Sequence, residues 1–488
     1  MSDALTDLSS TPLNADGSTE PSLKRTLGGF QVFAVSFSFI SVAVGVFATY
    51  DTVLQGSGPV GIWLWILVAV GQILVALVYA QFAGRIALSG SSHQWGSLLA
   101  NPKIGYAFGW MTVFLLAIGP VAIDNALAST ALMPLFGMEP DEQVARFLTV
   151  GVLLVQVVIV LASTRAVGII NSSAVALEIG LVAVLAVGLV IAVIAHGSVP
   201  TENLLSQGTA GDSPDYFAVG GGLMDAVVLG LATLVGFEAA ANMAEEAKDP
   251  FRTVPRAIIG SVVAAAVLGL VFLVALTVAI TDIPRVTASD SPVATIIKDQ
   301  LGPDVERILL VGISCAFFGA GLAVMTSASR LVFAMSRDGR FPGHRVMRRV
   351  NARTQTPVPA TLLTLAVGIV MMVALPGHAL LLLIIAATIT SSLLYGGTIV
   401  LYLAVRRRLD RREGSFDLGC FELPVSIAAL VWVVGAVISV INPPEAYIPD
   451  LVVVGILAVG GVVYYFLNRS NPSAFASTAS RRPRPGST

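Results

Sequence analysis

Charged residues are scarce in this chain of 488 residues: Asp, Glu, Lys and Arg together make up only 12%. Hydrophobic residues make up 55%, and the mean hydropathy is +0.85. A water-soluble fold of this size needs far more charge on its surface, so the composition excludes a soluble enzyme and a nucleic-acid-binding protein. The formal net charge of −2 is too small to indicate a charged partner. The composition is that of a protein embedded in a lipid bilayer.

Cysteine and histidine are also rare. The two cysteines, Cys315 in an apolar run and Cys420 in a basic loop, cannot build a disulfide framework. The four histidines, at positions 93, 196, 344 and 378, do not have the spacing of metal ligands, so we predict no metal site and no cofactor. The sequence also contains no glycine-rich phosphate loop and no converging nucleophile, base and orienting group. An enzyme and an ATP-driven pump are therefore not expected.

Apolar runs recur along the whole chain, and a spanning helix takes about 20 mostly apolar residues. The twelve runs are 31–54, 60–84, 105–133, 146–163, 168–195, 218–243, 256–281, 306–333, 358–375, 379–404, 424–441 and 451–467. We therefore expect an all-α integral membrane protein with about 12 transmembrane helices.

The distribution of basic residues predicts the orientation of these helices. Residues 1–30 carry no clear cleavage site and are expected to be a retained cytoplasmic tail. With this tail inside, 24 of the 28 Lys and Arg residues fall in segments on the inner side and 4 on the outer side. Basic residues are retained in the cytoplasm, so both termini should be cytoplasmic and the protein should lie in the cell membrane. Residues 468–488 have the composition of a disordered cytoplasmic tail.

Two of the twelve runs are interrupted by small and polar residues. Residues 37–51 of the first run contain three serines or glycines among apolar residues, and residues 231–246 of the sixth run contain Gly236 followed by Glu238. Unwound backbone within a bilayer is tolerated only where protein or a water-filled cavity satisfies its polar groups. An offset of five runs places the two helices in opposite directions, as an inverted repeat requires. The alternative is that Gly45 and Gly236 only allow close helix packing.

If both helices are broken, their backbone groups can recognise the two ends of a zwitterion. Free N–H groups of residues 43–47 would face a carboxylate, which the helix dipole favours. Carbonyl groups of residues 234–237 would accept hydrogen bonds from an amine. Phe47 and Phe237 could close over the ligand as gates, although an aromatic side chain in a membrane helix can equally serve packing.

Five segments carry a resemblance to a known family, in the same order along about 380 residues. They are SFISVAVGVFATY in the first run, QFAGRIALSGSSHQW with NPKIGYAFGW after the second, INSSAVALE in the fifth, GFEAAANMAEEAKDPFRTVPRAI in the sixth, and SRLVFAMSRDGRFP after the eighth. The chain resembles permeases of the amino acid-polyamine-organocation superfamily, particularly its amino acid/choline transporter group. The resemblance implies a leucine-transporter-like fold with a 5+5 inverted repeat, a ten-helix core at 31–405, and a basic loop with two peripheral helices at 406–467.

The resemblance also implies roles for individual residues. At the substrate carboxylate it places Ser41, Val42, Ala43, Val44 and Gly45, and at the amine it places Leu234, Val235, Gly236 and Phe237. Glu238 corresponds to the gating or coupling acid. Many relatives have two glycines or Gly-Ser-Gly in the first break, whereas this chain has only Gly45 there, which affects the carboxylate assignment more than the fold.

Acidic residues inside apolar runs indicate coupling to an ion, because each costs about 2.5–3.5 kcal/mol at the centre of a spanning helix. Glu238 and Glu178 are the two clearest cases. Either could bind and release a proton. Glu178 could also ligate sodium together with the hydroxyl groups of Thr326 and Ser327, and either acid could simply tether helices. Asp124 and Asn125 lie near the predicted outer end of their run. They could line an outer vestibule and attract amines, but we expect them instead to be solvated at a helix end.

The sequence therefore predicts a secondary active transporter that imports an amino acid or related amine by alternating access, with proton coupling the simplest choice. Alternatives within carriers are a γ-aminobutyrate, polyamine or choline carrier and an amino acid exchanger, with sodium as the other coupling ion. A channel is the alternative from another class. The expected partners are the small-molecule substrate and the lipid bilayer, without nucleic acid, and no prediction of oligomeric state follows.

Overall fold

The computed structural model describes residues 27–86, 91–197, 200–211, 213–218, 220–289, 291–351, 354, 356–374, 379–411, 414–441 and 447–475. Most of the two predicted tails, and His378, lie outside these residues. Within them the fold is all-helical, and the only strand-like feature is one isolated parallel bridge between Leu27 and Ala247. The all-helical class predicted from the sequence is confirmed.

Ten helical segments among the described residues are long and apolar enough to cross a membrane. They are built from α2 (Gly29–Ile40) with α3 (Val42–Gly56), α4 (Leu64–Arg85), α6 (Pro102–Ala126), α8 (Glu142–Ala162), α9 (Thr164–Ala195), α12 (Pro250–Val278), α15 (Pro303–Arg337), α18 (Ala379–Val405), α19 (Glu422–Ile441) and α20 (Tyr447–Ser470). Two shorter apolar helices, α10 (Gly222–Thr233) and α17 (Val358–Ala374), fall on the sixth and ninth predicted runs. The chain is a multi-pass membrane protein.

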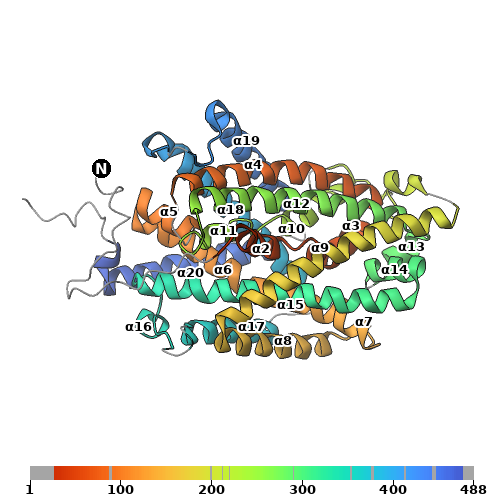
Figure 1. Cartoon of the computed structure of the whole chain (residues 1–488), viewed down its shortest axis with the longest axis horizontal. Helices are drawn as coiled ribbons and strands as arrows, with labels where there is room; N and C mark the ends of the chain where they lie inside the picture. Colours follow the sequence, from red (N-terminus) through yellow and green to blue (C-terminus); the bar gives the residue numbers. More distant parts are fainter. Residues whose placement is uncertain are drawn as a thin grey trace, which may run out of the picture.

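Short helices cover the two ends of the bundle. They include α5 (Ser91–Leu99), α7 (Met133–Leu135), α13 (Ile283–Thr287), α14 (Pro292–Leu301) and α16 (His344–Met347). The short helix α11 (Ala239–Asn242) lies inside the bundle, against α2 and α12. Figure 1 shows α5 and α16 at one end of the elongated bundle and α7, α13 and α14 at the other. The end with α5 also carries Arg85, Arg165, Arg330 and Arg406, and we call it the basic end.

Polar residues at the ends of the apolar runs determine where the helices begin. The side chain of Asn101 accepts hydrogen bonds from the amides of Lys103 and Ile104 at the start of α6, at 2.9 and 3.0 Å. Asp141 does the same for the amide of Val144 in α8, at 2.8 Å. These caps satisfy amides that have no partner within their helix. Between such ends, α12 packs along α4 and α2, and α15 packs along α6 and α9.

A buried charge cluster fixes α19 to the bundle at the basic end. Glu422 is 4% exposed and accepts hydrogen bonds from Arg85 Nη2 at 2.9 Å, Arg411 Nη2 at 3.1 Å and Tyr402 Oη at 2.9 Å. A buried carboxylate with several charge-assisted hydrogen bonds is fully partnered. The helix that follows the basic loop is thereby tied to α4 and α18.

The beginning of the predicted C-terminal tail differs from the expectation of disorder. Helix α20 continues to Ser470 and is followed by a short helix, η8 (Pro472–Phe475). Phe475 is only 5% exposed because its ring packs against Tyr106 and Tyr464, with centroids 5.8 and 5.1 Å away. An aromatic side chain near the end of an otherwise polar segment provides this anchor.

Candidate functional site

The first spanning segment breaks at Ser41. Helix α2 ends at Ile40 and α3 begins at Val42, and Ser41 between them has left-handed backbone angles, φ 35° and ψ 86°. The Ser41 hydroxyl and the Ala43 amide both donate to Oε1 of Glu178 on α9, each at 3.0 Å. A helix N-terminus attracts anions because its first amides have no partner within the helix. Glu178 therefore caps α3.

The cap leaves part of the helix terminus open. The amide of Gly45 bonds to the Ser41 carbonyl at 2.9 Å, as in a continuing helix. Among the described residues, the amides of Val42 and Val44 have no hydrogen-bond partner, and Val44 lines the cavity described below. The first break therefore leaves the Val44 amide as a possible donor to a ligand. The neighbouring Ala43 amide already donates to the carboxylate of Glu178.

The sixth spanning segment breaks between α10 and α11. Helix α10 ends at Thr233, and Gly236 has φ +91°, which only glycine adopts without strain. A Cβ atom at Gly236 would also lie 2.8 Å from Cβ of Phe39. The Gly236 amide donates to the hydroxyl of Tyr395 at 3.0 Å, and that hydroxyl donates to Glu238 Oε2 at 2.8 Å. Tyr395 of α18 thus holds both the unwound backbone and the acid.

The two broken segments contact each other directly. The Ser36 hydroxyl of α2 donates to the Phe237 carbonyl at 2.7 Å and accepts from the Ala240 amide at 2.9 Å. On the other side of the breaks, a Cβ atom at Gly45 would lie 2.1 Å from Thr233 Oγ1. The alternative raised by the sequence, that Gly45 allows close helix packing, agrees with this contact. Gly236, by contrast, is needed for the break itself.

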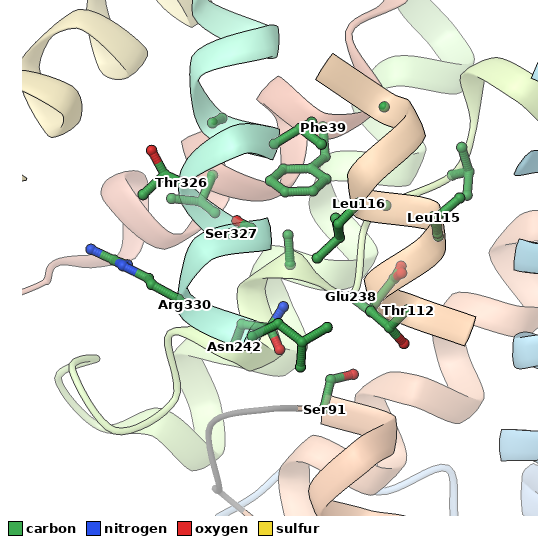
Figure 2. Close-up of a pocket in the computed structure, with 18 of the residues that line it drawn as sticks. Phe39, Ser91, Thr112, Leu115, Leu116, Glu238, Asn242, Thr326, Ser327 and Arg330 are labelled. Carbon is green, nitrogen blue, oxygen red and sulfur yellow. The ribbon is translucent and has the colours of Figure 1, made fainter. Parts of the chain in front are cut away.

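Both breaks border one large cavity of about 760 Å³. Figure 2 shows Thr326, Ser327 and Arg330 of α15 on one side of it and Thr112, Leu115 and Leu116 of α6 on the other. Arg165, Arg337 and Glu246 line its mouth at the basic end. At the opposite end, α3 packs against α10, and the Ser57 hydroxyl donates to the Gly222 carbonyl at 2.7 Å. The cavity is therefore reached from the basic end.

The cavity contains half of the site residues expected from the sequence. Those that line it are Val44, Gly45, Val235, Gly236, Glu238, Thr326 and Ser327. Those that lie outside its lining are Ser41, Val42, Ala43, Phe47, Glu178, Leu234 and Phe237. Phe237 is fully buried and its ring stacks on Tyr395 with centroids 5.0 Å apart, and Phe47 is 5% exposed. Thr326 donates its hydroxyl to the Leu322 carbonyl at 2.7 Å.

Several residues of the site were given no role in the site from the sequence. Tyr395 and Ser36 hold the breaks, while Phe39, Asn171, Asn242 and Arg330 line the cavity. Asn171 accepts a hydrogen bond from Ser38 at 2.7 Å, which ties α9 to α2. These positions are polar or aromatic residues within apolar runs, so an unexplained polar group in a spanning helix is the signal that could have found them.

The expectation for Asp124 was wrong. The side chain is not solvated at a helix end but fully buried between α6 and α8, with a hydrogen bond from Gln156 Nε2 to Oδ1 at 2.8 Å. The misplacement arose because α6 continues directly into a further helical turn, η3 (Leu127–Leu132), and α7. Asp124 therefore lies well within the bundle.

Comparison with known proteins agrees with this arrangement. A sequence model of the family described as "Amino acid permease" matches residues 27–466. The chain is 27% identical over 457 residues to amino-acid permease BAT1 of Arabidopsis thaliana, covering 87% of this chain and 86% of the relative. It is 26% identical over 485 residues to a BAT1 homolog of Oryza sativa, covering 91% and 90%. It is 25% identical over 360 residues to the branched-chain amino acid permease BcaP of Bacillus subtilis, covering 72% and 74%.

The family match covers nearly the whole chain, including both breaks and every cavity-lining residue named above. It confirms the resemblance carried by the sequence motifs. Its members are transporters and not enzymes. The chain belongs to the amino acid permease family, within the amino acid-polyamine-organocation superfamily.

Proposed function

We propose that the protein is a secondary active transporter that imports an amino acid or a related amine by alternating access, driven by protons. The observation that carries this proposal is the meeting of two unwound segments at one cavity, with backbone donors on one segment and acceptors on the other that have no partner in the described part of the chain. Backbone groups at mid-membrane depth without partners are costly unless a ligand or water satisfies them. A zwitterion would satisfy both sets.

The substrate carboxylate would bind the Val44 amide, at the positive end of the α3 dipole. The ammonium group would bind the carbonyl of Val235, which lines the cavity and has no partner among the described residues, and would approach Glu238. The Phe237 carbonyl is already bonded to Ser36 and is not needed for this arrangement. The apolar walls formed by Phe39, Leu116 and Val324 favour an apolar side chain on the substrate.

Glu238 is the better candidate for the coupling proton, because it lines the cavity, where substrate and water can reach it. Glu178 lies outside the lining, and its Oε1 already accepts two hydrogen bonds at the α3 terminus. Glu178 therefore caps α3. This is the helix-tethering role that the sequence left open as an alternative. No hydrogen bond joins it to Thr326 or Ser327 among the described residues, so the geometry gives less support to a sodium site there.

The proposed topology has twelve spans, both termini in the cytoplasm, and a core of two inverted five-helix repeats in the cell membrane. The short apolar helices α10 and α17 would complete the twelve spans, because each continues a run of the predicted length. The breaks after α2 and α10 would then occupy equivalent places in the two repeats. In this orientation the cavity faces the cytoplasm, since the basic end carries most of the Lys and Arg residues.

The test is uptake of labelled compounds into proteoliposomes, under an inward proton gradient, a sodium gradient, or neither. The panel consists of neutral, basic and acidic amino acids, γ-aminobutyrate, putrescine and choline. Saturable accumulation of an amino acid that requires the proton gradient supports the proposal. Flux without saturation or counterflow would indicate a channel, and uptake only into preloaded vesicles would indicate an exchanger.

Variants then locate the coupling acid. Glu238→Gln is expected to lose gradient-driven accumulation, and Glu178→Gln to keep it. Glu202→Gln, which changes an exposed glutamate in the short helix η4 (Thr201–Leu205), is the matched control. If Glu238→Gln and Glu178→Gln both retain full proton-driven uptake, the proposed coupling through these acids is wrong.

A further inference from the structure

A further buried acid, Asp124, lies behind the cavity wall and takes no part in the proposed substrate site or in the contacts of Glu238. Asp124 of α6 and Gln156 of α8 are both 0% exposed, and Gln156 Nε2 donates to Asp124 Oδ1 at 2.8 Å. Their other oxygens, Oδ2 of Asp124 and Oε1 of Gln156, are also buried, and neither has a partner among the described residues. Each of these two side chains therefore has one oxygen that receives no hydrogen bond, although the side chains already bond to each other.

Helix α15 encloses this pair. A Cβ atom at Gly321 would lie 2.5 Å from Asp124 Oδ1 and 2.6 Å from Gln156 Nε2, so the pair fills the space that a larger residue would need. The Gln156 amide also donates to the Phe318 carbonyl of α15 at 3.4 Å. Three helices therefore meet at one polar contact in an otherwise apolar region.

No basic side chain compensates Asp124 within the described part of these helices. The other titratable groups on the helices packed around it are Lys103 and Tyr106 on α6, Glu142 and Arg146 on α8, and Asp304, Glu306, Arg307, Cys315, Arg330 and Arg337 on α15, with none on α17. Arg146 pairs with Glu142 at one end of α8. Arg330 is separated from Gly321 by about 14 Å of helix at 1.5 Å per residue. An ionised Asp124 would therefore be a buried charge with a single neutral hydrogen bond.

Protonation of Asp124 removes both the uncompensated charge and the two oxygens without a hydrogen-bond donor. A buried carboxylate without a counter-ion is strongly disfavoured relative to its neutral form. A carboxylic acid has an O–H group that can donate to the amide oxygen of Gln156, while its other oxygen keeps the bond from Gln156 Nε2. Every buried polar atom of the pair then has a partner, which is the normal condition in folded proteins.

We propose that Asp124 and Gln156 form a proton-binding site that is loaded in this cavity-open conformation and releases its proton during the transport cycle. This inference rests on the proposed proton-coupled function. The wall between the pair and the cavity is thin: Ile123 and Ala126 of α6 and Ala323 and Val324 of α15 line the cavity. Release of the proton requires a shift of α15 against α6 and α8 that separates Gly321 from the pair and admits water.

The test combines infrared spectroscopy with transport on full-length protein in proteoliposomes. The wild-type spectrum at neutral pH is expected to contain a protonated carboxyl band that Asp124→Asn removes. Asp124→Asn keeps the shape of the neutral acid, so substrate counterflow is expected to persist while accumulation driven by a proton gradient is lost. Asn125→Ala is the matched control, because Asn125 lies on the same helix and also bonds to α8, through Thr149 at 3.1 Å. It should keep the band, the counterflow and the accumulation.

Two results would overturn the inference. If the carboxyl region of the infrared spectrum is the same in wild type and Asp124→Asn, Asp124 is ionised, and a bridging water donates to the two oxygens instead. If the band is present but Asp124→Asn accumulates substrate as wild type does, the proton does not take part in transport. Absence of counterflow for every compound in wild type would refute the proposed function instead, and the infrared band would still report the state of Asp124.

Discussion

Tyr395 donates its hydroxyl hydrogen to Glu238 at 2.8 Å while the same oxygen accepts the amide of Gly236 at 3.0 Å. One side chain of α18 therefore controls the shape of the second break and the surroundings of its acid. The ring of Tyr395 also stacks on Phe237 and meets Tyr79 edge-on, with centroids 5.0 and 5.4 Å apart. The hydroxyl is held in place by a packed aromatic group.

We predict that Tyr395→Phe keeps the packing but impairs both stability and transport. The Gly236 amide and Glu238 would each lose a buried hydrogen bond, at a cost of about 1–3 kcal/mol for the group left without a partner. Thermal unfolding in detergent and labelled uptake measure the two effects. Tyr465→Phe, at a tyrosine 59% exposed, is the control. Wild-type uptake by Tyr395→Phe would show that this hydroxyl has no role in the site.

Gly45→Ala should be far more harmful than an alanine elsewhere in a spanning helix. The added methyl group would lie 2.1 Å from Thr233 Oγ1 and 2.7 Å from Thr233 Cβ, so α3 and α10 must separate. Overpacking of this kind costs about 1–3 kcal/mol. The control is Gly435→Ala on α19, where nothing lies within 4 Å. A double variant with Thr233→Gly should recover part of the melting temperature, and no recovery would contradict the contact.

The cap on α3 predicts that substitutions of Glu178 lower the melting temperature by different amounts. Glu178→Gln keeps an oxygen that can accept from Ser41 and Ala43, whereas Glu178→Ala removes it, so Glu178→Ala should melt lower than Glu178→Gln. Loss of a cap costs about 0.5–2 kcal/mol. Ser41→Ala, which removes one of the two donors, should fall between wild type and Glu178→Ala. Equal melting temperatures for the two Glu178 variants would exclude a capping role.

The contact between α5 and the end of α15 should weaken in acid. His93 Nε2 lies 3.6 Å from Asp338 Oδ2. Burial acts to raise the pKa of Asp338, but the neighbouring His93 and the charges of Arg340 and Arg337 outweigh it and hold the pKa below its ordinary value of 3.8. A carboxyl group with a lowered folded-state pKa stabilises the fold above its ordinary pKa and loses that contribution as the pH falls through the folded-state value.

The measurement for this contact is thermal unfolding of wild type and Asp338→Asn as a function of pH. At neutral pH, Asp338→Asn should melt at a lower temperature than wild type. The gap should begin to narrow as the pH approaches the ordinary pKa of 3.8, and it should close only below the lowered folded-state pKa, where both side chains are neutral. A gap that stays constant across this range would mean that Asp338 contributes by packing alone.

The two cysteines allow a test of orientation. Cys420 is an exposed free thiol in the short helix η6 (Gly419–Phe421) at the basic end. With the basic end in the cytoplasm, a membrane-impermeant maleimide should label Cys420 in inside-out vesicles and leave it unlabelled in intact cells. Cys315→Ser removes the second thiol and leaves Cys420 as the only target. Labelling in intact cells would reverse the proposed orientation.

The breaks could be located from the sequence because small and polar residues interrupt otherwise apolar runs at Ser41 and Gly236. That signal is local, and so is the chemistry of an unwound helix in a bilayer. What holds each break is not local: Glu178 is 137 residues from Ser41, and Tyr395 is 157 residues from Glu238. A single sequence contains no record of such pairings.

The same reasoning explains the error at Asp124. Counting residues along α6 places it near a helix end, but the helical turns of η3 extend the segment beyond it. Its partner Gln156 and its neighbour Gly321 come from two other helices, and neither has a distinctive sequence context. Burial of an acid depends on how helices assemble, which periodicity within one helix does not report.

The contacts at Gly45 and Ser36 also have a mechanical meaning. Gly45 packs directly against Thr233, so we expect α3 and α10 to move as one rigid unit. The hydrogen bond of Ser36 joins α2 to the segment around Phe237 as a second unit. Between these two units, the described backbone leaves the helical conformation at Ser41 and from Leu234 to Gly236. We therefore expect a motion that opens the far end of the bundle to move α3 and α10 together about the backbone that faces the cavity.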